Sequence, residues 1–167
     1  MAGNNIRIVT AGILVCMMML FGCPDYLHGS GLHVALTHHF FHVNVFHIAV
    51  NLFSIWTLFA KGRYYNLKQL LAAYVIATIS WYFSTGSTVG ISNMIFALIG
   101  LRTPSLKDRW WRQSSVLTFF IVTVGMAFLP NVSAVTHIVS FVLGCICAAV
   151  QRFVNRLGRD FSRAAYH

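Results

Sequence analysis

The segment STGSTVGISNMIFALIGLR, residues 84–102, is the most informative part of this sequence about its structure. Its apolar part, Ile91 to Leu101, is too short to cross about 30 Å of hydrocarbon at about 1.5 Å per residue. The segment before it, residues 84–90, consists of Ser, Thr, Gly and one Val. Irregular backbone at membrane depth is tolerated only where protein or a water-filled cavity surrounds it. The pattern therefore predicts a short buried helix that begins inside a cavity open to the outer face, with Ser92 at its N-terminus.

The composition of the whole chain places this stretch in a membrane protein. Of the 167 residues, 57% are hydrophobic and 9% are charged, whereas soluble domains carry roughly 25% charged residues. Apolar stretches recur along the chain at about 7–22, 40–60, 67–83, 91–103, 114–129 and 132–151. We therefore expect an all-α polytopic membrane protein with six transmembrane helices, the fourth of them short and buried.

The basic residues give the orientation of these six helices. They occur only before the first stretch and after the second, fourth and sixth: Arg7; Lys61, Arg63, Lys68; Arg102, Lys107, Arg109, Arg112; Arg152, Arg156, Arg159, Arg163. Short cytoplasmic loops collect Lys and Arg, so both termini are predicted to be cytoplasmic. Membrane topology then accounts for the net charge of +9. We expect the lipid bilayer, and no nucleic acid, as the partner of these charges. The predicted location is the plasma (inner) membrane, as a multi-pass protein.

Two alternatives concern the ends of the chain. The first stretch resembles a cleaved signal peptide, whose removal would leave five spans, although a retained helix is the preferred interpretation. The predicted domains are a six-helix transmembrane domain at 1–151 and a basic cytoplasmic C-terminal tail at 152–167. The four tail arginines recur at helical spacing, with Phe153, Leu157 and Phe161 between them. This pattern suits either a helix that extends into anionic headgroups or a solvated tail.

Four hydrogen-bonding side chains are predicted at a similar depth in the outer leaflet. Counting about 1.5 Å per residue, Ser92 lies about 15 Å above Arg102, and His47 lies about 10 Å below an outer helix end near Phe40. Asn51 is one turn deeper than His47, and His137 lies about 8 Å below an end near Val132. Polar groups at such depth are functional candidates, because an unsatisfied one is costly.

Residue spacing indicates which side chains share a helix face. His38 and His42 are four residues apart, as are His47 and Asn51, so each pair is predicted to share a face. Small residues recur on the fourth and sixth stretches and let two membrane helices approach closely. The two predicted faces are Ser92, Phe96, Gly100 and His137, Ser140, Gly144, Ala148. Close approach is what a hydrogen bond between Ser92 and His137 would require.

These residues resemble the motifs of the rhomboid intramembrane serine proteases. The matching segments are Thr37 to His42, His47 to Leu52, Gly90-Ile91-Ser92-Asn93, and His137 with Gly144. The resemblance implies a rhomboid-like fold of six helices, with a catalytic site open to the extracytoplasmic side. It also implies that the substrates are transmembrane proteins cut near the outer face.

Carried over by position, the resemblance assigns a role to each matching residue. Ser92 corresponds to the nucleophile and His137 to the general base. His47, Asn51 and the backbone N–H of Ser92 correspond to oxyanion-hole donors. Phe96 corresponds to an aromatic that stacks on the base, and His42 and Gly90 are expected to support the site. The chain has no Glu, and Asp25, Asp108 and Asp160 fall in predicted loops or the tail, so we expect a Ser-His dyad without cofactor or metal.

Departures from the family pattern keep a second function open. Asn93 and Ser140 stand where the family has glycine, and the first outer loop, residues 23–37, is short and lacks the family's Trp-Arg pair. The acidic-basic motif that the family has after the second span is also missing. The alternative is a catalytically inactive rhomboid-like protein that binds membrane helices.

A third hypothesis is metal binding or transport, prompted by the density of histidines between His28 and His47. Imidazole is a common ligand for zinc, copper and nickel, and His38 with His42 has a helical ligand spacing. Against this hypothesis, no carboxylate lies within a predicted span. We expect His28, His33 and His39 to lie in a solvated loop instead.

Overall fold

The described part of the chain is helical. The computed structural model describes residues 31–42, 45–60, 65–84, 88–103, 113, 116–117 and 133–164. Its elements are α2 (Leu32–Thr37), the 3-10 helix η2 (His38–Phe40), α3 (Val45–Ala60), α4 (Leu67–Trp81), α5 (Ser92–Arg102) and α7 (Ala134–Ala164). The all-α prediction is thereby confirmed for these residues. The apolar stretch at 7–22 and most of that at 114–129 lie outside them.

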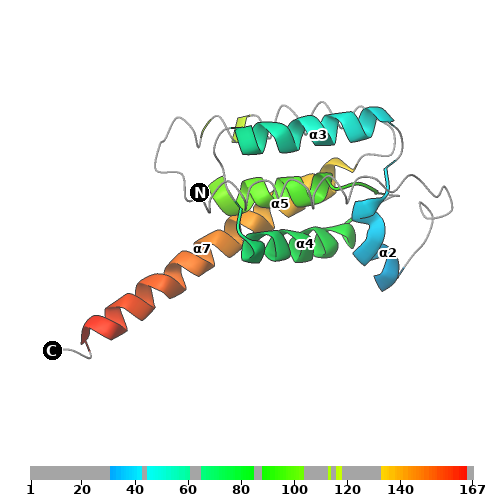
Figure 1. The fold of residues 1–167 in the computed structure, drawn as a ribbon. Coiled ribbons are helices and arrows are strands. Elements are labelled where there is room, and N and C mark those ends of the chain that lie inside the picture. Colours follow the sequence, from blue (N-terminus) through cyan, green and yellow to red (C-terminus); the bar gives the residue numbers. More distant parts are fainter. Residues whose placement is uncertain are drawn as a thin grey trace.

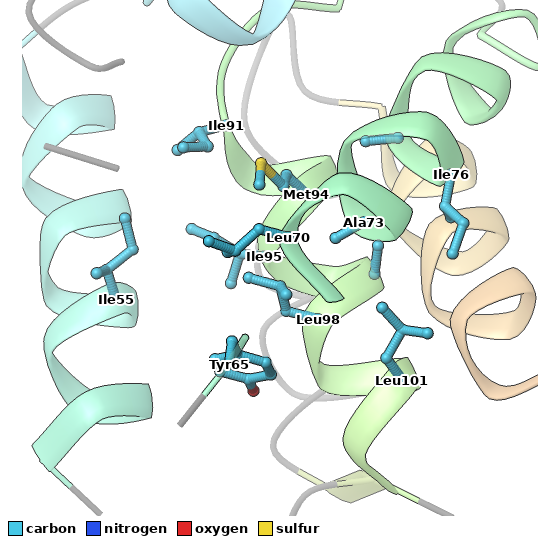
Figure 2. Close-up of a cluster of buried hydrophobic side chains, with 12 residues drawn as sticks. Ile55, Tyr65, Leu70, Ala73, Ile76, Ile91, Met94, Ile95, Leu98 and Leu101 are labelled. Carbon is cyan, nitrogen blue, oxygen red and sulfur yellow. The ribbon is translucent and has the colours of Figure 1, made fainter. Parts of the chain in front are cut away.

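The predicted short buried helix is α5, which lies between α3, α4 and α7 (Figure 1). Nine of its eleven residues are buried, including the two polar residues at its start, Ser92 and Asn93. Its apolar side chains pack with Leu70, Ala73 and Ile76 of α4 and with Ile55 of α3 (Figure 2). This confirms that α5 is enclosed by protein, as its length requires.

The surface of this bundle is more apolar than that of a soluble protein, and polar groups are buried beside its apolar core. Every fourth residue of α4 on one face is a large exposed apolar side chain: Leu67, Leu71, Val75, Ile79. A similar exposed row runs along α7: Val135, Ile138, Val142, Ile146, Val150. Buried positions, by contrast, include polar groups such as Asn51, Ser80 and Thr136. Apolar faces turned outward, together with buried polar groups, suit a lipid environment.

Within the described residues, α7 is the one helix long and apolar enough to cross a membrane. Its apolar window falls within Ala134–Ser162. The helices Leu67–Trp81 and Ser92–Arg102 and the segment Val45–Ile55 are apolar but shorter.

The second predicted span begins later than expected. Its helix, α3, starts at Val45, whereas the apolar pattern predicted an outer end near Phe40. The chain instead forms η2 up to Phe40 and is extended at Phe41, with φ −97° and ψ 145°. His47 is therefore the third residue of α3, and the continuous helix from Phe40 to His47, from which its depth was counted, is not present.

Two glycines allow α5 and α7 to approach closely. A Cβ built on Gly144 would lie 2.5 Å from the carbonyl oxygen of Ala97 and 2.9 Å from the amide nitrogen of Leu101. A Cβ on Gly100 would meet the carbonyl oxygen of Phe141. All of these atoms are backbone, so no side chain can move aside to make room. The two helices run in parallel at this contact, since Ala97 meets Gly144 and the Ser92 side of α5 meets His137.

Replacing Gly144 with alanine is expected to lower the free energy of unfolding by about 1–3 kcal/mol, the usual cost of overpacking. The matched control is Gly158→Ala on the same helix, where an added Cβ meets nothing within 4 Å. That change should raise the free energy of unfolding by up to about 1 kcal/mol through helix propensity. Unfolding of both variants in detergent, followed by circular dichroism, checks the pair; shifts of the same sign would contradict the close contact.

Candidate active site

Ser92 and His137 meet between α5 and α7. Ser92 is the first residue of α5 and His137 lies in the first turn of α7. The Oγ of Ser92 lies 2.9 Å from the Nε2 of His137. The side chains are 3% and 1% exposed. A hydroxyl and an imidazole from two distant stretches of chain are thus in hydrogen-bonding contact in a largely desolvated place.

Phe96 supports the imidazole from one side. It follows Ser92 by one turn of α5, and its ring centroid lies 4.5 Å from that of His137, with the ring planes tilted by 37°. Contact at this distance limits rotation of the imidazole while leaving Nε2 directed to Ser92.

No carboxylate completes a triad within the described residues. The Nδ1 of His137 is buried and has no hydrogen-bond partner among them. Asp160 is exposed and lies 23 residues further along α7, about 35 Å away at 1.5 Å per residue. The arrangement in this part of the chain is therefore a serine-histidine pair.

Gly90 brings His47 and Asn51 against the backbone that precedes Ser92. Its φ is +109°, a conformation that glycine adopts without a Cβ penalty. A Cβ at this position would lie 2.6 Å from Cε1 and 3.0 Å from Nε2 of His47, and 3.6 Å from Nδ2 of Asn51. Both side chains thus contact the loop two residues before the serine. The Nδ2 of Asn51 is buried and makes no hydrogen bond to any described residue, which leaves this donor available to a ligand.

The main chain around Ser92 is held from the other side by η2. The N–H of Gly90 donates to the carbonyl oxygen of His38 at 2.9 Å. Ile91, the N-cap residue of α5, has no side-chain acceptor, so it does not cap the first backbone N–H groups of this helix. Such groups favour negative charge at a helix N-terminus. The contact between Gly90 and His38 is one that sequence reasoning missed, because a main-chain bond leaves no side-chain signal.

Three of the histidines before α3, His38, His39 and His42, are buried. His39 is fully buried, and its Nε2 lies 3.3 Å from the Oγ1 of Thr78, so the prediction of a solvated His39 is wrong. His33 is exposed, as predicted, but it lies in α2 and not in a loop, and His28 lies outside the described residues. His38 is also buried, with its Nδ1 2.8 Å from the carbonyl oxygen of Ala35. Burial lowers the pKa of His38, which precedes α3, to about 4.

The prediction that His38 and His42 share a helix face is wrong. His38 is in η2, whereas His42 follows the extended residue Phe41. His42 instead lies beside His47, with ring centroids 5.2 Å apart at 60°. In the part of the chain that the structure describes, no three His, Cys, Asp or Glu side chains are placed to hold a metal ion.

Asn93 and Ser140, the two departures from the family pattern, do not disrupt the Ser92–His137 contact. Both are fully buried. Neither side-chain atom of Asn93, nor the Oγ of Ser140, has a hydrogen-bond partner among the described residues. The two positions therefore carry a desolvation cost without blocking the pair.

Replacing Ser140 with alanine is expected to raise the free energy of unfolding by about 1 kcal/mol, because it removes a buried unsatisfied hydroxyl. Ser80→Ala is the matched comparison: Ser80 is equally buried, but its Oγ donates to the carbonyl oxygen of Ile76 at 2.8 Å. The free energy of unfolding of Ser80→Ala should fall by about 1 kcal/mol. Denaturant unfolding in detergent measures both, and a loss of stability in Ser140→Ala would contradict this account of Ser140.

The comparison with protein families agrees with this arrangement. The model of the rhomboid domain matches residues 29–152, a range that contains every site residue named above. No curated protein and no solved structure matches the chain. Rhomboid proteins are generally intramembrane serine proteases, and the family includes inactive members. Because the match covers well over half of the 167 residues, the chain belongs to the rhomboid family and is a membrane-embedded protein.

Proposed function

We propose that this chain is an intramembrane serine endopeptidase that cuts transmembrane helices of other proteins near the outer face. The observation that carries the proposal is the 2.9 Å contact between the Oγ of Ser92 and the Nε2 of His137. A nucleophile and its general base need this separation. The proposal includes the six-span topology with both termini in the cytoplasm, and a site reached by water from the extracytoplasmic side.

In the acylation step, the Nε2 of neutral His137 removes the proton of Ser92 as its Oγ attacks the scissile carbonyl carbon. The carbonyl π electrons move to the oxygen, which becomes an oxyanion. When the tetrahedral intermediate collapses, the C–N bond breaks and the Nε2–H of His137 protonates the leaving amine. Water then attacks the Ser92 ester, His137 accepts its proton and returns it to Oγ, and a carboxylic acid product leaves.

The oxyanion is stabilised by donors from α3 and from the first residue of α5. The Nδ2 of Asn51, the imidazole of His47 and the backbone N–H of Ser92 are the proposed donors. Support comes from the position of His47 and Asn51 against Gly90, and from the buried Nδ2 of Asn51. Preorganised donors in a desolvated site are worth more than the same donors in water.

The proposed substrate is a transmembrane helix with small or helix-breaking residues near its outer end. An intact helix hides its carbonyl groups in hydrogen bonds, so local unwinding has to precede attack. Helices enclose the site, and the side chains of Ser92 and His137 are only 3% and 1% exposed. An extended strand of substrate fits such a site more readily than a helix about 10 Å wide.

The test is cleavage of a model single-span substrate by the purified protein in liposomes. One substrate carries Gly and Pro near its outer end, and its control carries Leu at the same positions. We expect cleavage of the first only, at a bond near the outer face that mass spectrometry locates, and no effect of a chelator. Binding without cleavage would favour the inactive helix binder, and loss of activity with the chelator would favour metal chemistry.

A further inference from the structure

The last third of α7 extends beyond the other helices of the described bundle (Figure 1). The helix has 31 residues, which is about 46 Å at 1.5 Å per residue, whereas the hydrocarbon core is about 30 Å thick. About ten residues thus remain after the span. From Phe153 to Ser162 every residue is exposed, so no described part of the protein covers this segment.

The arginines of this segment occupy one narrow face of the helix. Arg152, Arg156, Arg159 and Arg163 follow one another at intervals of four, three and four residues. At about 100° per residue their backbone positions fall within an arc of about 60°. Residues 152–163 contain these four arginines and one aspartate, Asp160, which gives a net charge of 4 − 1 = +3.

Large apolar side chains occupy the opposite face. Phe153, Leu157 and Phe161 are 63%, 42% and 74% exposed, and Val154 is 58% exposed. These four positions cover an arc of about 100°, centred about 140° from the arginine face. A helix with an apolar face, an opposite cationic face and no protein partner is the pattern of a helix that lies in the membrane interface.

We propose that residues 152–163 of α7 dock onto anionic lipid headgroups in the leaflet at which α7 ends. The apolar face enters the boundary between headgroups and acyl chains, and the arginines bind lipid phosphates through charge-assisted hydrogen bonds. Charge complementarity selects this occupant, because a second copy of the segment would bring a second net charge of +3 to the same place.

Gly158 lies in the middle of this exposed segment. A Cβ on Gly158 would meet nothing within 4 Å, so packing gives no reason for glycine here. Glycine weakens a helix interior, so this residue does not stabilise the exposed end of α7 either. His137 precedes Arg152 by 15 residues, about 22 Å along α7, so the docking surface is separate from the Ser92–His137 pair.

The test is hydrogen exchange of the full chain in nanodiscs, which expose both leaflets. Amide exchange over residues 152–162 is compared in discs of phosphatidylcholine alone and in discs that also contain phosphatidylglycerol. We expect exchange to be at least about tenfold slower in the anionic discs at low salt, with most of this difference lost in high salt. The double variant Arg156→Gln/Arg159→Gln should lose most of the difference, and Asn155→Gln, an exposed residue beside the charged face, should retain it.

Equal exchange in the two lipids would overturn the proposal. Protection that depends on the number of copies per disc, and not on the lipid, would also overturn it and would identify a second copy as the occupant. Phe161→Ser should lower the protection in anionic discs as well; unchanged protection in this variant would contradict the burial of the apolar face. None of these outcomes depends on peptide cleavage, so the experiment can reject the docking surface without rejecting the proposed protease activity.

Discussion

Replacement of Ser92 by alanine is expected to lower the rate of peptide cleavage by at least about 10³-fold. The hydroxyl supplies the atom that forms the acyl intermediate, and in this structure it is the only group seen within hydrogen-bonding distance of the Nε2 of His137 in the described part of the chain. The fold should persist, since the change removes one oxygen from a side chain that is 3% exposed. The measurement is initial cleavage of the model substrate by parent and variant at equal protein concentration.

Ser80→Ala is the control for this comparison. Ser80 is a fully buried serine of α4 whose Oγ bonds the main chain of its own helix. Its loss should leave the cleavage rate within a few-fold of the parent. Cleavage by Ser92→Ala at a rate near that of Ser80→Ala would show that another group is the nucleophile.

The second large effect is expected for Gly90→Ala, which should lower the cleavage rate by about 10² or more, the size of effect seen when an oxyanion donor is lost. An added Cβ would lie 2.6 Å from Cε1 of His47, so either this imidazole or the loop that leads into Ser92 has to move. Either movement separates the proposed donors from the nucleophile.

Gly31→Ala separates this steric effect from backbone strain. Gly31 has a φ of +118°, close to the +109° of Gly90, but a Cβ there would come no nearer than 3.6 Å to its closest neighbour in His33. Both variants therefore carry the strain of an L-residue at positive φ, about 1–3 kcal/mol. We expect only Gly90→Ala to lose activity; an equal loss in Gly31→Ala would indicate that strain, and not contact with His47, is responsible.

Much of the site follows from residue spacing and composition. The eleven-residue length of α5, its burial and the position of Ser92 at its start were all predicted from an apolar run too short to span a bilayer. The approach of α5 to α7 was predicted from small residues at Gly100 and Gly144. The length of α5 is a local feature, and the contact with α7 follows from small residues that recur with the period of each helix. The roles of Ser92 and His137 remain predictions that rest on the family and on the geometry.

Other features depend on contacts between distant residues or on the chemistry of a turn. His39 is buried against α4, where its Nε2 is hydrogen-bonded to the Oγ1 of Thr78, 39 positions later in the chain. No pattern around His39 indicates this contact. The start of α3 at Val45 did have a signal, because Asn44 is a residue type that is favoured immediately before a helix. The largely apolar stretch from Phe40 onward led to a helix start that is too early, since hydrophobicity alone does not mark where a helix begins.

Labelling with a fluorophosphonate probe in detergent, followed by mass spectrometry of the modified peptide, shows whether His137 activates Ser92. The probe reacts with a serine whose proton is removed by a neighbouring base, which is the role proposed for His137 opposite Ser92. We predict a single modified residue, Ser92, in the parent protein and no labelling in His137→Ala. Labelling of Ser92 that persists in His137→Ala, or a parent protein that takes up no probe, would contradict the account.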